Sequence, residues 1–152
     1  MRFLCDEMLA SLARLLRAAG YDADLATGGQ RDEAILARAK AEARVLLTRD
    51  RRLASAGGPG AVLLAEPTAE AQARALSRLL PIDWTLAPFT RCVVDNAPLR
   101  TATPEEVARM PQGSRSRGGP FRACPVCGRL YWPGSHVKRM AARLQALSAP
   151  QA

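Results

Sequence analysis

The sequence predicts an α/β fold with a mostly parallel sheet, followed by a small zinc-binding domain. In the first half of the chain, short apolar runs alternate with segments of helical periodicity, which is typical of parallel strands joined by helices. In the second half, Cys-Pro-Val-Cys-Gly at 124–128 has the spacing of a zinc knuckle. These two observations put the sheet before the metal-binding segment.

Residues 2–5 form a short apolar run that ends at two acids, and we expect a strand there. In residues 8–19 the leucines recur at helical spacing, and Gly20 marks the end of this helix because glycine readily adopts the left-handed conformation. Residues 21–25 are expected to form a second strand. After a glycine turn, two acids open a second helix over residues 32–43.

Residues 45–47, Val-Leu-Leu, are the compact apolar run of a strand that is buried on both faces. A short helix over 51–56 and a glycine-rich turn come before a fourth expected strand over 61–65. Residues 67–80 begin with Pro-Thr and predict a helix with one apolar face. After a segment rich in proline and glycine, residues 136–147 predict a final helix with a basic side.

A change in composition near residues 81–91 divides the chain into residues 1–85 and residues 86–152. Residues 1–90 contain 12 arginines and lysines against 11 acids, whereas residues 91–152 contain 10 against 3. Almost all of the net charge of +8 therefore lies in the last part of the chain. A basic surface attracts polyanions, and nucleic acid above all.

The composition excludes several classes of protein. With 152 residues, 48% of them hydrophobic and 24% charged, the chain has the composition of an ordinary globular protein. No stretch has the roughly 20 apolar residues of a membrane span. The sequence also contains no phosphate-binding glycine loop, so we expect no nucleotide cofactor. The N-terminus lacks the apolar run of a signal peptide, so we expect a cytoplasmic protein whose paired cysteines bind metal. No feature predicts an oligomeric state.

Acidic residues follow two of the expected strands. Asp6 and Asp50 each come directly after an apolar run, and groups beyond the carboxyl ends of parallel strands line the ligand crevice of an open sheet. Asp32 and Glu33 begin the helix between those strands and can converge on the same edge. Clustered carboxylates suit Mg²⁺ or Mn²⁺, which can activate a water for attack on a phosphodiester. The alternative is that these acids only cap helices or form turns.

The cysteines point to a second kind of metal site. Cys124 and Cys127 supply half of a tetrahedral zinc site. The other half is expected from Cys92 and Asp95, where an aspartate stands at the position of a second Cys-x-x-Cys thiolate. His136 or a water is the alternative fourth ligand. The competing interpretation is a redox pair or a set of idle thiols.

Basic and aromatic residues of the last part are candidates for RNA binding. Arginines in an expected flexible loop over residues 112–119 can hold phosphates, and a tryptophan can stack on a base. The alternatives are a solvated loop and a tryptophan that only packs in the core of the small domain. The candidate RNA-binding residues are Arg115, Arg117, Arg122, Arg129, Trp132, Lys138 and Arg139.

Four stretches carry a family resemblance: FLCDEML at 3–9, LLTRD at 46–50, RC at 91–92 with Asn96 and Pro98-Leu99, and CPVCGRLYWPGSH at 124–136. In order and spacing they resemble the mut-seven C-terminal RNase domain family. That family is described as a PIN-like nuclease fold with a zinc ribbon at its C-terminal end. The resemblance spans nearly the whole chain.

The resemblance implies a PIN-like three-layer nuclease domain over residues 1–85 and a zinc-ribbon domain with a C-terminal helix over residues 86–152. It also implies a ribonuclease that uses Mg²⁺ or Mn²⁺ to leave 5′-phosphate and 3′-hydroxyl ends. By position, the catalytic acids are Asp6, Asp50 and either Asp32 or Glu33, and the zinc ligands are Cys92, Asp95, Cys124 and Cys127. A fourth acid of the PIN pattern is not evident after residue 50.

A second interpretation is a non-catalytic RNA- or ribosome-binding protein that keeps the same fold. The missing fourth acid and the aspartate at position 95 favour this interpretation. The three retained acid positions favour the nuclease. Both interpretations predict RNA as the partner and zinc in the small domain.

Overall fold

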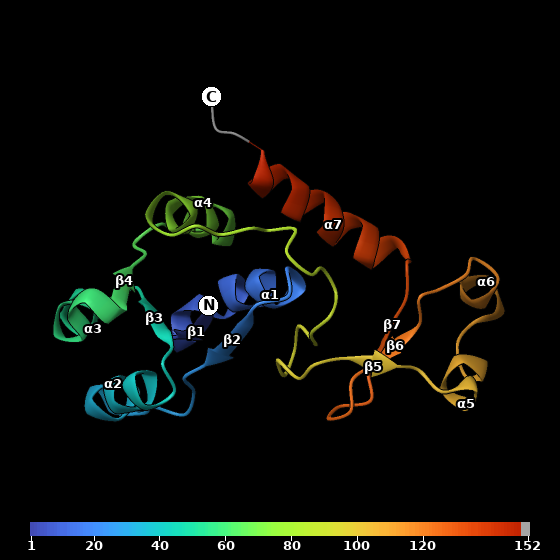
Figure 1. Ribbon diagram of the computed structural model, residues 1–152, viewed down its shortest axis with the longest axis horizontal. Helices are drawn as coiled ribbons and strands as arrows, with labels where there is room; N and C mark the ends of the chain where they lie inside the picture. Colours follow the sequence, from blue (N-terminus) through green and yellow to red (C-terminus); the bar gives the residue numbers. More distant parts are fainter. Residues whose placement is uncertain (150–152) are drawn as a thin grey trace.

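Four short parallel strands form the main sheet. The computed structural model describes residues 1–149 (Figure 1). The strands lie in the order β2-β1-β3-β4, and every neighbouring pair is parallel. Their bounds are β1 Arg2–Cys5, β2 Asp22–Leu25, β3 Val45–Thr48 and β4 Ala61–Leu63. The expected α/β fold with a mostly parallel sheet is therefore confirmed.

Helices cover both faces of this sheet because side chains alternate along each strand. Phe3 and Cys5 of β1 point into one apolar core, while Leu4 points into a second core on the opposite face. Helix α1 (Ala10–Ala18) buries its three leucines in the first core, and helix α4 (Ala69–Leu79) buries Leu76 there. The second core is closed by α2 (Asp32–Ala41) and α3 (Arg51–Gly57), with short 3-10 turns η1 (Glu7–Leu9) and η2 (Gly58–Gly60) at the ends of strands and helices.

A second, smaller sheet lies beyond the main one. Its three antiparallel strands have the order β5-β6-β7, with bounds Arg100–Thr101, Arg122–Ala123 and Leu130–Tyr131. The short helices α5 (Pro104–Ala108) and α6 (Gln112–Arg115) fill the connection between β5 and β6. Figure 1 shows this group of elements to one side of the parallel sheet.

The last helix joins the two parts of the molecule. Helix α7 (Ser135–Ser148) starts beside the small sheet and runs back to α4 (Figure 1). Leu144 and Leu147 are buried in the same core as α1 and α4. Arg143 forms an ion pair with Glu70 of α4. The C-terminal helix thus completes the helical layer over the parallel sheet.

Three local features differ from the sequence-based expectations. Strand β4 ends at residue 63 rather than 65, because the chain turns toward α4. In this turn the Gln72 side-chain amide donates a hydrogen bond to the Glu66 carbonyl at 2.8 Å. Helix α5 was not expected, although Thr103 and Glu106 form a reciprocal capping box at its start. The expected loop over residues 112–119 begins with one helical turn, α6.

In the part of the chain that the structure describes, no helix is both long enough and apolar enough to cross a membrane.

Helix α7 is expected to contribute strongly to the stability of the whole protein. Leu144→Ala should lower the free energy of unfolding by about 2–5 kcal/mol, because it removes a fully buried side chain. Urea unfolding followed by circular dichroism measures this loss. Leu79→Ala is the matched control on α4, since Leu79 is 61% exposed and its truncation should cost less than about 0.5 kcal/mol. Equal costs for the two variants would show that α7 does not belong to the core.

Candidate metal centres

The parallel arrangement brings two acidic residues to the same edge of the main sheet. Strands β1 and β3 are neighbours, with Cys5 paired to Leu47, so both strands end at the same edge. Asp6 directly follows β1, and Asp50 lies two residues after β3. The register of the two strands therefore places both residues at the same edge of the sheet.

The carboxylate of Asp6 is buried and held by three donors. One oxygen accepts hydrogen bonds from the Thr48 hydroxyl and from the Arg49 N–H at 2.9 Å. The other accepts from the Met8 N–H at 2.9 Å, which caps the short turn η1. Only 7% of Asp6 is exposed. Its orientation is thus fixed by the end of β3 as well as by its own turn.

Thr48 links the two acids. Its buried hydroxyl donates to Asp6 and accepts from the Asp50 N–H at 2.9 Å. Asp50 in turn caps α3, because its Oδ1 accepts from the Arg52 N–H at 2.7 Å and the Leu53 N–H at 3.2 Å. Sequence reasoning did not identify Thr48 as a site residue. The signal for it was its place within Leu-Leu-Thr-Arg-Asp, one of the stretches that carried the family resemblance.

Three aspartates and one glutamate line a single cavity at this edge. The cavity has a volume of about 160 Å³, and Asp6, Glu7, Asp32 and Asp50 are among its lining residues. No arginine or lysine lines it. Glu33 is not in the lining; its side chain is 85% exposed and lies 4.0 Å from that of Arg31. Of the two adjacent candidates, Asp32 is therefore the one that faces the cavity.

The chemistry of these donors suits a hydrated hard cation. Asp50 uses only its Oδ1 as a helix cap, which leaves Oδ2 for an ion or its waters. Within residues 1–149, the carboxylates of this cavity do not form a group whose ligand atoms all lie within 4.8 Å of one another. Mg²⁺ and similar ions keep several waters and need only one or two direct carboxylates, so this looser arrangement is compatible with them.

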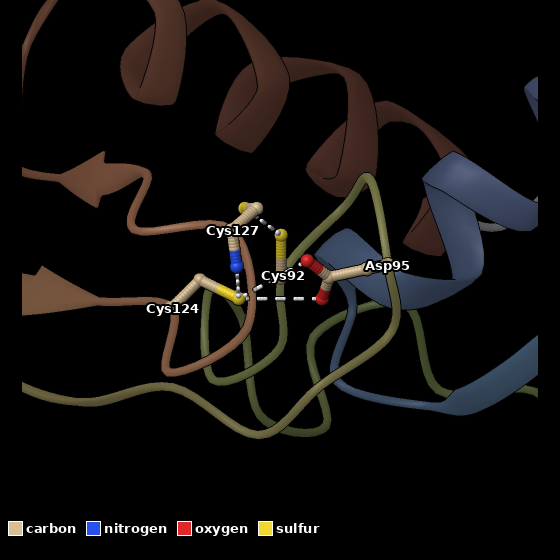
Figure 2. A group of neighbouring side chains, drawn as sticks. All are labelled: Cys92, Asp95, Cys124 and Cys127. Carbon is tan, nitrogen blue, oxygen red and sulfur yellow. Dashed lines mark hydrogen bonds between the residues drawn. The ribbon is translucent and has the colours of Figure 1, made fainter.

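A second group of ligands forms a tight cluster. One ligand atom from each of Cys92, Asp95, Cys124 and Cys127 lies within 4.8 Å of all the others (Figure 2). The sulfur atoms of Cys92 and Cys127 are 3.8 Å apart, and all four cysteines of the chain are free thiols. Two thiolates bound at about 2.3 Å to one tetrahedral ion lie at about this separation. The cluster could hold a metal ion, and its donor set is consistent with zinc.

Hydrogen bonds around the cluster orient its ligands. The Tyr131 hydroxyl donates to Cys92 Sγ at 3.2 Å, and the backbone N–H groups of Val126 and Cys127 point to Cys124 Sγ at 3.4 and 3.5 Å. Burial acts to raise the pKa of Cys92, but the Tyr131 hydroxyl and nearby N–H groups bring that pKa below its ordinary value. Such outer partners fix the orientation of metal ligands. Tyr131 is therefore part of the site, a role that sequence reasoning had not given it.

The pKa values of Cys124 and Asp95 are shifted in opposite directions. Burial is the main cause that raises the pKa of Cys124 to about 11, and hydrogen bonding to Asp95 adds to the effect. Burial also acts to raise the pKa of Asp95, but the Ala97 N–H and the three thiols bring it below its ordinary value. Ligands must lose their protons to bind metal, so binding of a metal ion at this cluster would release protons.

The loop that carries Cys92 and Asp95 is attached to the main sheet. The buried Arg17 of α1 donates to the Ala23 carbonyl at 2.7 Å and to the Val93 and Val94 carbonyls at 3.2 and 2.8 Å. Asn96 contacts the same strand β2, where its Oδ1 accepts from the Ala23 N–H at 3.1 Å. These contacts join the loop of Cys92 and Asp95 to the edge of the parallel sheet.

The remaining predicted residues lie outside the four-ligand cluster. His136 is exposed at the start of α7 and lies 3.0 Å from the Arg139 side chain. Arg122 donates to the Phe89 carbonyl at 2.6 Å. The other predicted RNA-binding residues lie on α6 or α7 or in the connections next to them and to the small sheet. Arg115, Arg117, Arg129, Lys138 and Arg139 are exposed, and Trp132 is half-buried.

Fold and sites together define an α/β protein with two candidate sites. One is the acidic cavity at the strand ends, and the other is the group of Cys92, Asp95, Cys124 and Cys127, which we call the thiolate cluster. The family model described as Mut7-C RNAse domain matches residues 1–144. The chain therefore belongs to the Mut7-C RNAse domain family, and the resemblance found in the sequence is confirmed. Comparison with curated proteins gave no match, and comparison with solved structures gave none.

Cys124→Ser is expected to abolish zinc binding and to loosen the small sheet, because this sheet has little apolar core of its own. Elemental analysis should find about one zinc per chain in the wild-type protein and none in this variant. Cys5→Ala is the control, since Cys5 lies in the core of the main sheet and burial raises its pKa to about 12. A wild-type protein purified without zinc, or a zinc-loaded Cys124→Ser variant, would contradict the assignment.

Proposed function

We propose that this protein is a metal-dependent ribonuclease of PIN-like fold that hydrolyses RNA phosphodiester bonds. The observation that carries the proposal is the convergence of Asp6, Asp32 and Asp50 on one acidic cavity at the carboxyl edge of the sheet. Membership of the Mut7-C RNAse domain family supports the same reaction class.

The acidic cavity would hold the ion through Asp6, Asp32 and Asp50. Bound there, Mg²⁺ or Mn²⁺ supplies an activated water and neutralises charge on the phosphodiester. Asp6 is held in place by Thr48 and the Arg49 N–H, and so offers a preorganised carboxylate. Asp50 keeps one oxygen for the cavity while the other caps α3. Glu7 adds a fourth acidic side chain to the lining, from the turn after β1.

The basic part of the chain would bind the RNA. Residues 91–152 carry 10 arginines and lysines against 3 acids, whereas no arginine or lysine lines the acidic cavity. The positive charge on the small sheet and α7 would attract the phosphates of RNA. The acidic cavity would repel a phosphate unless a cation is bound there. This division assigns binding to one part and cleavage to the other.

The thiolate cluster would hold a structural zinc ion in a zinc ribbon formed within residues 86–152. Zinc bound by four protein ligands has no open position for a substrate, so its contribution is to folding. The four free thiols are compatible with a reducing compartment, and we propose a cytoplasmic location.

A second candidate function is RNA or ribosome binding without cleavage. It is favoured by one observation: Asp6 and Asp50 both make capping hydrogen bonds that would keep them useful to the fold without any metal. In that case the basic surface would act alone. The two candidate functions predict different results when an acidic charge is removed from the cavity. A ribonuclease would lose RNA cleavage, whereas a binding protein would change at most in stability.

Asp50→Asn is expected to lower Mn²⁺-dependent cleavage of end-labelled RNA by at least about 100-fold, because it removes a metal ligand. Asparagine caps helices as well as aspartate does, so folding and RNA binding should be retained. Asp83→Asn, an exposed site on the loop after α4, is the matched control and should cleave like the wild type. Unchanged cleavage in Asp50→Asn would refute the site, and a wild-type protein that binds but never cleaves would favour the second candidate.

The cavity also separates the two adjacent acids at the start of α2. Asp32→Asn should lower cleavage by at least about tenfold, whereas Glu33→Gln should stay within about twofold of the wild type, because only Asp32 lines the cavity. Initial rates over a range of Mn²⁺ concentrations measure both effects. The opposite order, with Glu33→Gln the weaker enzyme, would move the metal site to the outer face of α2.

A further inference from the structure

A second and larger cavity lies between the small sheet and the start of α7. Its volume is about 440 Å³, which is within the range of about 300–1,000 Å³ that is typical of small-molecule sites. Strand β7 and the first turn of α7 form part of its wall, and Phe89, Val93 and Met140 supply apolar surface. This cavity does not include any of the four thiolate-cluster ligands or any residue of the acidic cavity.

An indole ring forms part of the wall of this cavity. Trp132 is half-buried, and its edge lies against Gly134 at the start of α7. A Cβ atom at position 134 would lie 2.8 Å from Trp132 Nε1, which is closer than a side-chain contact allows. Glycine at 134 therefore allows the ring to lie beside the helix start, with a partly exposed surface available for stacking.

The charged side chains that line the cavity are arginines. Arg117, Arg129 and His136 line it, and no aspartate or glutamate does. Throughout residues 1–149, neither Arg117 nor Arg129 takes part in an ion pair, so both charges are available to an anion. The N–H groups of the first turn of α7 add positive potential at the same wall.

We propose that this cavity binds one unpaired nucleotide of a single-stranded RNA, with the base stacked on Trp132 and its phosphate held by Arg117 and Arg129. The proposal rests on the proposed function, which makes RNA the substrate, and adds that the substrate is single-stranded at this position. A base within a duplex is stacked on its neighbours and cannot reach the indole. A nucleotide fits this cavity better than a free inorganic anion does, because the cavity combines apolar walls and an aromatic face with two arginines.

The experiment measures binding by fluorescence anisotropy with a labelled 12-nucleotide oligoadenylate and with the same strand paired to oligouridylate, in the Asp50→Asn background that prevents cleavage. The single strand should bind more tightly than the duplex. Trp132→Ala should weaken single-strand binding by about tenfold and change duplex binding by less than about twofold. Single-strand binding should also quench the fluorescence of Trp132, since the other tryptophan, Trp84, is only 1% exposed and cannot contact a base.

A second pair of variants tests the cations without touching the aromatic core. Arg129→Gln should weaken single-strand binding and lower the salt dependence by about one phosphate contact. Arg109→Gln is the matched control, because Arg109 is exposed in the same basic part of the chain but does not line the cavity. Equal losses in these two variants, equal affinity for duplex, or tight single-strand binding by a folded Trp132→Ala would overturn the proposal.

The outcomes also separate this proposal from the proposed function. If the wild type cleaves RNA while the cavity variants bind and cleave normally, only the cavity assignment fails. If the wild type neither binds nor cleaves RNA, the proposed function fails and the cavity proposal fails with it. If phosphate ion or adenosine monophosphate binds but the oligonucleotide does not, the cavity is a small-anion site and the proposal is overturned.

Discussion

The arrangement of the two parts of this protein depends on one buried guanidinium. Arg17 is 5% exposed and has no carboxylate partner among residues 1–149. It donates to three backbone carbonyls, one on β2 and two on the loop that carries Cys92 and Asp95. A buried charge without such partners would be costly, so the loop must stay where its carbonyls can meet α1. If the cluster holds zinc as proposed, three thiolates and a carboxylate would carry four negative charges against the two positive charges of the ion, and Arg17 is a cation close to this excess.

The two cavities have opposite charge, and the fold explains why. Asp6 and Asp50 meet because parallel strands begin and end together, and the Thr48 hydroxyl joins them in one hydrogen-bonded unit. The larger cavity arises where α7 leaves the small sheet, a region that contains few acids and many arginines. A cation favoured by one cavity is repelled by the other, and the reverse holds for a phosphate. The proposed metal ion and the proposed RNA would therefore not compete for the same surface.

The sequence predicted those features that depend on local pattern. Buried strands such as Val45–Thr48 were evident as apolar runs. The spacing of Cys124 and Cys127 indicated half of a zinc site, and the family resemblance implied the other half, Cys92 and Asp95. The two-residue strands of the small sheet were not, because two residues carry no periodicity and their pairing is set by long-range contacts. The choice between Asp32 and Glu33 also needed the structure, since adjacent residues at a helix start point in directions about 100° apart. Thr48 and Arg17 act through partners 42 and 76 residues away, which no local pattern reports.

The attachment of the loop that carries Cys92 and Asp95 has a consequence for the behaviour of the protein in solution. Strand β2 is at an edge of the main sheet, and unpaired N–H and C=O groups at such an edge can recruit a strand from another molecule. Here Asn96 and Arg17 occupy the outward N–H and C=O of Ala23, and the Asp24 side chain accepts from the N–H of Leu25. The loop therefore shields the edge against intermolecular strand pairing. Loss of order in that loop would expose a template for aggregation as well as disturb the candidate metal site.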